Sequence, residues 1–225
     1  MDTLGVLTIG QAPRQDVAPI LEKHMQMDVA LLQMGALDGL TKEYIDKNLS
    51  PNEIDDGYIL TSRLASGESV RMLRQKLQPL LQKRINDMEE RGIKQILLLC
   101  TGVFPELSTT KAHLIEPDLV IPPAVKLMIG QKRLGVIVPL KEQMESMDDK
   151  FNRVGLDPVF AHASPYEDGS EPFRKAASQL KDKVEYILLD CMGYNEEIRD
   201  LVKKYSGIPT ILSNALMAKI VSEFV

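Results

Sequence analysis

Two cysteines occupy corresponding places in separate parts of this 225-residue chain. Cys100 follows the apolar run ILLL (96–99), and Cys191 follows the similar run ILLD (187–190). Two thiols can act as an acid–base pair, because a thiolate removes a proton from one face of a carbon atom while a thiol returns a proton to the other face. Such a pair needs no cofactor. Free cysteine is also among the most buried residue types, so a purely structural role is the alternative for both residues.

The stretches around these cysteines predict short strands that alternate with helices. Strands are predicted at 4–9, 28–34, 96–99, 135–138, 186–189 and 208–212, and most of them are apolar on both faces. Strands of this kind form a parallel sheet covered by helices on each side, and ligands bind at the carboxyl edge of such a sheet. Each cysteine is therefore expected in a loop at that edge.

The remaining elements and an internal echo complete the predicted fold. An antiparallel hairpin is predicted from 58–63 and 69–73. Helices are predicted to begin at Pro13 and to run from about Leu73 to Arg91 and from Lys141 to Arg153. Asn195 and Ser213 are predicted to cap two later helices. The first strand and its helix resemble the strand at 135–138 and its helix, just as ILLLC resembles ILLDC. We predict two similar α/β domains, 1–115 plus 213–225 and 116–212, with the active-site cleft between them.

The composition and the missing motifs exclude several classes of function. The share of hydrophobic residues is 44%, and the formal net charge is −5 from interspersed acids and bases, which argues against a nucleic-acid partner. No apolar run reaches the ~18–20 residues that span a membrane, and two cysteines without a secretion signal suit a reducing cytoplasm. The sequence has no G-x-G-x-x-G after its first strand and no cysteine–histidine spacing typical of zinc sites, so we expect neither a dinucleotide cofactor nor a metal.

Six stretches together resemble the AroM family, which is named for its link to aromatic amino-acid biosynthesis genes. They are LTIGQAPRQD (7–16), ILTSRLASGESV (59–70), LLLCTGVFPEL (97–107), LGVIVPLKEQ (134–143), LLDCMGY (188–194) and PTILSNALMAKI (209–220). AroM proteins in turn look like remote members of the aspartate/glutamate/hydantoin racemase superfamily. This resemblance implies two flavodoxin-like, three-layer αβα halves with parallel sheets, related by a pseudo-two-fold axis, with the active site between them.

The resemblance also places the two cysteines and their neighbours. Cys100 with the following Thr101 and Gly102 stands where the racemases have Cys-Asn-Thr, and the segment 191–193 stands where they have Cys-Thr-Glu. Thr101 thus replaces an amide, Met192 a hydroxyl and Gly193 an acid. The implied activity is a racemase, isomerase or related lyase that acts at the carbon next to a carboxylate, with the two thiols as acid and base.

A small carboxylate metabolite is the expected partner, and it needs hydrogen-bond donors of its own. Arg14 and Arg63 are the best candidates for a forked contact with a carboxylate, although each could instead pair with an acid such as Asp16 or Glu68. Dimers are common for this architecture, so a homodimer is left open. The other expected substrate-binding residues are polar or glycine residues that follow the strands: Thr8, Gln11, Thr101, Gly102, Gly193, Ser213 and Asn214.

Two other functions are weighed against the enzyme. A protein that kept the site but lost catalysis could bind or sense a metabolite of the aromatic (shikimate) pathway, and the replaced neighbours of the cysteines favour this alternative. A thiol redox sensor is the third hypothesis, and it would require a thiolate at neutral pH.

Overall fold

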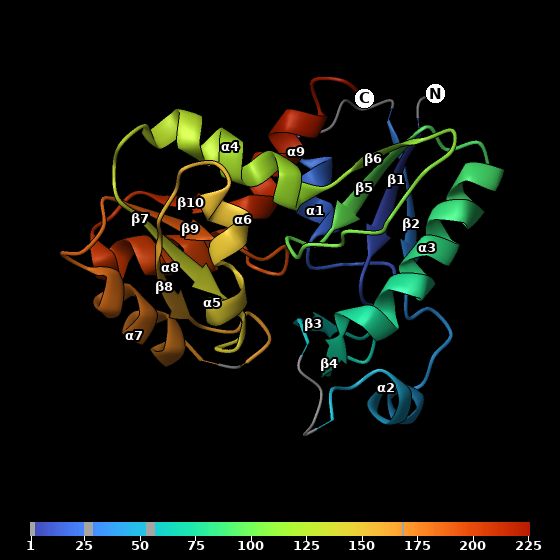
Figure 1. Ribbon diagram of the computed structural model, residues 1–225, viewed down its shortest axis with the longest axis horizontal. Helices are drawn as coiled ribbons and strands as arrows, with labels where there is room; N and C mark the ends of the chain where they lie inside the picture. Colours follow the sequence, from blue (N-terminus) through green and yellow to red (C-terminus); the bar gives the residue numbers. More distant parts are fainter. Residues whose placement is uncertain (1–2, 25–28, 53–56, 168) are drawn as a thin grey trace. The chain divides into compact units, whose positions relative to one another are not determined.

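The computed structural model describes residues 3–24, 29–52, 57–167 and 169–225 (Figure 1). The chain divides into two compact units, Met1–Pro117 with Ala218–Val225 (unit 1) and Asp118–Met217 (unit 2). Each unit has its own four-stranded parallel sheet, so the predicted α/β class is confirmed. Among the described residues, no helix combines the length and the apolar character that crossing a membrane requires.

The sheet of unit 1 contains β1 (Thr3–Thr8), β2 (Ala30–Gly35), β5 (Gln95–Leu99) and β6 (His113–Ile115). The strand order is β2-β1-β5-β6, and each neighbouring pair is parallel. Both central strands are buried on both faces, which explains why their sequences are almost continuously apolar. The register places Thr8, the last residue of β1, beside Leu99, the residue that precedes Cys100.

The predicted hairpin and long helix of unit 1 are also confirmed. Strands β3 (Ile59–Arg63) and β4 (Ser69–Leu73) pair antiparallel, and Gly67 takes a φ of +90° in the turn that joins them. Helix α3 (Arg74–Glu90) begins directly after β4 and lies along the sheet of unit 1 (Figure 1). It ends just before Gly92, which has a φ of +80°. Its buried stripe is Leu77, Leu81, Ile85 and Met88, the spacing of one helical face.

The helix predicted from Pro13 is wrong, because the first helix, α1 (Ala18–Glu22), begins five residues later. The main-chain N–H groups of Ala12 and Arg14 donate to side-chain oxygens of Asp38 and Gln33, at 2.8 and 2.9 Å, which holds this stretch as a loop. Pro19 occupies the first helical turn instead. The loop that follows β1 is therefore built by side chains from β2 and from the segment after β2.

The sheet of unit 2 contains β7 (Leu134–Val138), β8 (Val159–His162), β9 (Tyr186–Leu189) and β10 (Thr210–Leu212), in the order β10-β9-β7-β8. Counted along the chain within each unit, both sheets have the order second-first-third-fourth, with all neighbours parallel. In both sheets the strand order reverses between the first and third strands, and ligands of open α/β sheets bind at the carboxyl ends of the strands at such a reversal.

The helices of unit 2 confirm one prediction and correct another. Asn195 caps α8 (Glu196–Ser206) by accepting the N–H of Ile198, as predicted. The continuous helix expected from Lys141 to Arg153 forms instead as α5 (Gln143–Ser146) and α6 (Asp148–Asn152), separated at Met147. The remaining helices of the described residues, in both units, are α2 (Lys42–Asn48), α4 (Pro117–Ile129), α7 (Glu171–Leu180) and α9 (Ser213–Val221).

Candidate functional site

Cys100 is the first residue after β5, the third strand of its sheet, and its side chain is buried. Its Sγ accepts the N–H of Gly102 at 3.3 Å. A Cβ at Gly102 would lie 2.9 Å from Cδ2 of Leu60 in β3, so the hairpin packs over this loop too closely for a side chain. Thr101 is buried as well. The loop after β5 thus curls a main-chain donor back onto the thiol, beneath the hairpin.

Cys191 holds the equivalent place in unit 2, directly after β9, the third strand of that sheet. Its Sγ accepts the N–H of Gly193 at 3.4 Å, the same two-residue pattern as in unit 1. Its side chain is half-buried, whereas that of Cys100 is buried. The hydroxyl of Tyr166, in the loop after β8, lies 3.9 Å from this Sγ. Both cysteines are free thiols.

The end of β1 carries a buried arginine. The guanidinium of Arg14 donates from Nε and Nη2 to the two carboxylate oxygens of Asp16, each at 2.7 Å, and from Nη1 to Oγ1 of Thr8 at 3.2 Å. The fork of Arg14 is therefore engaged by an acid of its own chain, the alternative weighed for it above. Burial raises the pKa of the Asp16 carboxyl, but the hydrogen bonds and charge of Arg14, helped by the charge of Arg63, outweigh it, so that this pKa is lowered overall.

Gln11 connects three segments of unit 1 through its side-chain amide. Its Nε2 donates to the carbonyl oxygens of Leu37 and Leu40, at 3.3 and 2.9 Å, and its Oε1 accepts the N–H of Ala65 at 2.8 Å. The amide thereby holds the hairpin turn against the loops that follow β1 and β2. Gln11 shapes this edge of the sheet through main-chain contacts.

A hollow of about 280 Å³ lies between the loop after β1 and the hairpin turn. Arg14 and Arg63 line it together with Asp16. The hollow thus lies at the carboxyl edge of the sheet, where its lining carries a surplus of one positive charge, which suits a small anion. Its full lining is Gln11, Pro13, Arg14, Gln15, Asp16, Arg63, Leu64, Ala65 and Gly67.

A buried ion pair stands next to Cys191. Nζ of Lys150, from α6, lies 2.6 Å from Oδ2 of Asp190, and the two side chains are 1% and 0% exposed. Asp118 is also buried and pairs with Arg153. Burial raises the pKa of the Asp118 carboxyl, and the charges of Lys150 and Arg153 offset this only in part. The residue before Cys191 is thus anchored by a lysine from another element.

Ser213 and Asn214 support the Cys191 loop from the buried start of α9. Oγ of Ser213 donates to the carbonyl of Leu189 at 2.7 Å. Nδ2 of Asn214 donates to the carbonyl oxygens of Met192 and Tyr194, at 3.0 and 2.6 Å. These donors bind the main chain on both sides of Gly193, so the structure places them as supports of the loop.

Within unit 1 the structure brings Thr8, Arg14 and Arg63 to one edge of the sheet, and within unit 2 it brings Ser213 and Asn214 to the Cys191 loop. Sequence reasoning missed Tyr166 and Lys150, whose contacts with this loop span 25 and 40 residues of chain. The one available signal was Gly193, a glycine at a place where a side chain was expected. In the part of the chain that the structure describes, no group of histidine, cysteine, aspartate and glutamate side chains could hold a metal ion.

Comparisons with known proteins agree on the family and on the fold. The sequence profile of the AroM family, described as AroM protein, matches residues 4–225. No curated protein matches the chain.

Solved structures of similar fold include allantoin racemase from Klebsiella pneumoniae, with a TM-score of 0.66 and 10% identity over 99% of this chain and 87% of that one. The aspartate racemase of Picrophilus torridus gives a TM-score of 0.63 and 12% identity, over 99% and 95% of the two chains. An unliganded arylmalonate decarboxylase gives a TM-score of 0.57 and 11% identity, over 99% and 93%. The fold is thus similar to that of these racemases and this decarboxylase.

Proposed function

The chain belongs to the AroM family, and from this membership and its racemase-like fold we propose that it is a cofactor-independent isomerase or related lyase. It acts on a small carboxylate, at the carbon next to the carboxyl group, with Cys100 and Cys191 as acid and base. The similar structures include two racemases and a decarboxylase, which is why the proposal covers both an isomerase and a lyase.

One observation carries the proposal: the two thiols are topologically equivalent. Each follows the third strand of a sheet with the same strand order, at the reversal between first and third strands, and each Sγ accepts the N–H of the glycine two residues later. A structural cysteine needs neither the repeated place nor the repeated donor. Main-chain N–H groups that point at sulfur favour its thiolate form, which is the form that removes protons.

The chemistry requires the thiols to reach opposite faces of one carbon atom. One cysteine, as thiolate, takes the proton from the α-carbon and becomes a thiol, while the electron pair of the broken C–H bond moves into the carboxylate as an enediolate. The other cysteine, as thiol, gives its proton to the opposite face and becomes a thiolate. The carbon is inverted, and the two cysteines have exchanged protonation states.

The hollow beside Arg63 is the proposed seat of a substrate carboxylate. Arg63 lines this hollow at the end of β3, while Arg14 and Asp16 hold each other and shape its wall. A guanidinium gives a planar contact with a carboxylate that a lysine cannot reproduce. Arg63→Lys should therefore raise KM for the substrate while leaving the thiols in place.

The deciding experiment follows exchange of the α-proton in D₂O by NMR. The panel is aspartate, glutamate, hydantoins, malate-like diacids and shikimate-pathway acids, each incubated with wild type, with Cys100→Ser and with Cys191→Ser. Loss of the α-proton signal with wild type, but with neither variant, is the expected result. Circular dichroism and melting temperature verify that the variants fold.

Two results would overturn the proposal that this protein is an enzyme. Exchange that continues in both serine variants would remove the thiols from the chemistry. No exchange across the panel, together with a melting temperature raised by one of the acids, would identify instead a metabolite-binding protein without catalysis.

A further inference from the structure

We propose that the phenol of Tyr166 is a second hydrogen-bond donor to the thiolate of Cys191, and that it sets the pH at which this thiol becomes reactive. The catalytic consequence rests on the proposed function, whereas the hydrogen bond is a property of unit 2 alone. Tyr166 acts through the thiol, as a positioning residue.

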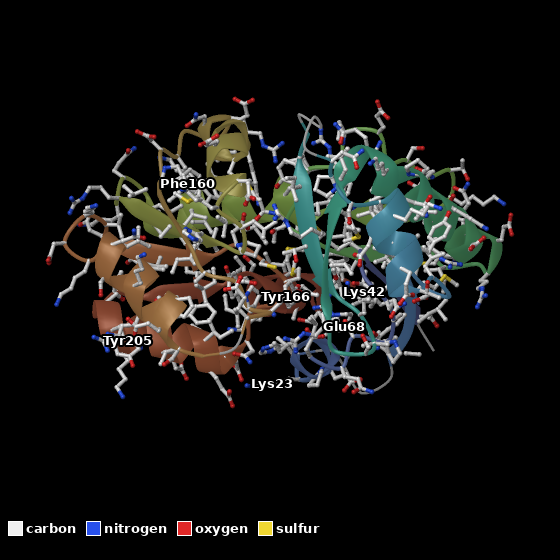
Figure 2. All side chains as sticks on the ribbon, turned by 90° about the horizontal axis from the view of Figure 1, so that it is seen from below. Lys23, Lys42, Glu68, Phe160, Tyr166 and Tyr205 are labelled. Carbon is white, nitrogen blue, oxygen red and sulfur yellow. The ribbon has the colours of Figure 1, made fainter. Side chains whose placement is uncertain are left out.

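The first observation is the distance of 3.9 Å between Oη of Tyr166 and Sγ of Cys191. The backbone of the tyrosine is fixed nearby, because its N–H donates to Oγ of Ser164 at 3.2 Å. The ring therefore approaches Cys191 from the loop after β8, an element separate from the cysteine's own loop. Figure 2 labels Tyr166 among the side chains of this unit.

The second observation is the absence of a side chain at Gly193. A Cβ there would lie 2.4 Å from Oη of Tyr166, 2.7 Å from Cζ and 2.9 Å from Cε1, distances that real contacts do not allow. The phenol thus occupies the space that any other residue at 193 would fill. The same glycine donates its N–H to Cys191, so one residue both admits the phenol and supplies the main-chain donor.

Ionisation of the cysteine makes the direction of the hydrogen bond unambiguous. While the thiol keeps its proton, either the sulfur or the phenol can be the donor. A thiolate can only accept, and phenols keep their proton at neutral pH. The thiolate of Cys191 then accepts from the N–H of Gly193 and from the hydroxyl of Tyr166. Donors to the charged form favour that form.

Two other titratable groups near Cys191 in unit 2, Asp190 and Tyr194, have partners of their own. Asp190, on the same loop, is paired with Lys150 from α6 at 2.6 Å. Tyr194 donates its hydroxyl to the carbonyl of Ala163 at 2.7 Å. Burial raises the pKa of Tyr194, and the nearby Cys191, Asp190 and Tyr166 raise it further, so this phenol stays neutral. Tyr166 is the neutral donor whose hydroxyl reaches the sulfur.

The test measures the alkylation rate of Cys191 by iodoacetamide from pH 5 to pH 10, in full-length Cys100→Ser protein so that only one thiol reacts. Tyr166→Phe keeps the ring and removes the hydroxyl. In Tyr166→Phe the pH at which the alkylation rate is half-maximal should be about 0.5–1 pH unit higher than in the parent protein. The reaction at pH 7 should then be roughly threefold to tenfold slower. Tyr205→Phe is the matched control, because Tyr205 lies on α8 across unit 2 from Tyr166 (Figure 2).

Gly193→Ala provides an independent arm, because its Cβ displaces the phenol without removing it. It should raise the midpoint as Tyr166→Phe does, and the double variant should show no further rise. Superimposable curves for Tyr166→Phe and its parent, or a shift to lower pH, would overturn the proposal. Since alkylation needs no substrate, this outcome is independent of whether deuterium exchange is found.

Discussion

Replacing Lys150 with methionine tests the buried ion pair that anchors the residue before Cys191. The Nζ of Lys150 lies 2.6 Å from the carboxylate of Asp190, and neither side chain is more than 1% exposed. Methionine has a similar length, so it fills most of the same space without the charge. The variant therefore isolates the loss of the ammonium from the loss of packing.

The expected loss of stability is large because a buried carboxylate is deprived of its cation. Removing one partner of such a pair typically costs about 3–5 kcal/mol, out of a total of about 5–15 kcal/mol for a whole domain. With a dependence of about 2 kcal/mol per molar urea, the unfolding midpoint should fall by about 1.5–2.5 M. Asp118 adds to the loss, since Lys150 also lowers the pKa of that carboxyl.

The assay is urea unfolding at pH 7 and pH 4, followed by circular dichroism. Burial raises the pKa of the Asp118 carboxyl and the charge of Lys150 opposes this, so without Lys150 that carboxyl holds its proton to a still higher pH. The folded state then binds more protons than the unfolded state above pH 4, so the deficit should grow from pH 4 to pH 7. Lys150→Met with Asp190→Leu should recover most of the stability, because packed apolar residues replace a buried pair at little cost.

An exposed pair supplies the control for this experiment. Lys132 and Glu185 lie 2.9 Å apart with side chains 60% and 36% exposed, so Lys132→Met should leave the midpoint unchanged. If Lys150→Met unfolds at the wild-type urea concentration with an unchanged slope, the reasoning is refuted, because the lysine would not be stabilising a buried charge.

Two further predictions concern the supports of the two loops. Asn214→Ala leaves the buried carbonyls of Met192 and Tyr194 without their amide donor, so the free energy of unfolding should drop by about 2–4 kcal/mol. Urea titration measures this value, and an unchanged free energy would count against the support role. Asp16 has a pKa lowered below its ordinary 3.8, chiefly through Arg14 acting against burial, so its stabilising contribution is complete above pH 3.8 and is lost as the pH falls below it. The stability gap between wild type and Asp16→Asn should close at acid pH, and a gap that persists at pH 2 would contradict this linkage.

The parts of the fold that sequence predicted are those where local pattern and tertiary structure agree. Apolar runs buried on both faces predicted the strands, and Gly92 marked the end of α3. The helix expected at Pro13 did not form there because the side chains of Gln33 and Asp38, 19 and 26 residues further along the chain, accept the main-chain N–H groups of Arg14 and Ala12. A propensity argument sees the proline but not its distant partners.

The same limit applies to the candidate site. The cysteines could be singled out, because a position after a strand of a parallel sheet is encoded in the order of elements. Tyr166 could not, because its contact depends on how the loop after β8 folds back over Gly193. Asn214 was predicted to bind substrate as a polar residue that follows a strand, and the sequence did not reveal that its buried Nδ2 donates to two main-chain carbonyls of the Cys191 loop.

The two thiols have equivalent places in their sheets, and each accepts the main-chain N–H of the glycine two residues later, but their surroundings differ. Cys100 is covered by the hairpin, with Leu60 packed against Gly102, and its side chain is buried. Cys191 is half-buried and is approached by the hydroxyl of Tyr166. Extra donors and access to water both favour a thiolate, whereas burial among apolar groups favours the protonated thiol. The two-base mechanism that we propose needs one of each before the first proton transfer, and under that proposal these surroundings favour Cys191 as the base and Cys100 as the acid.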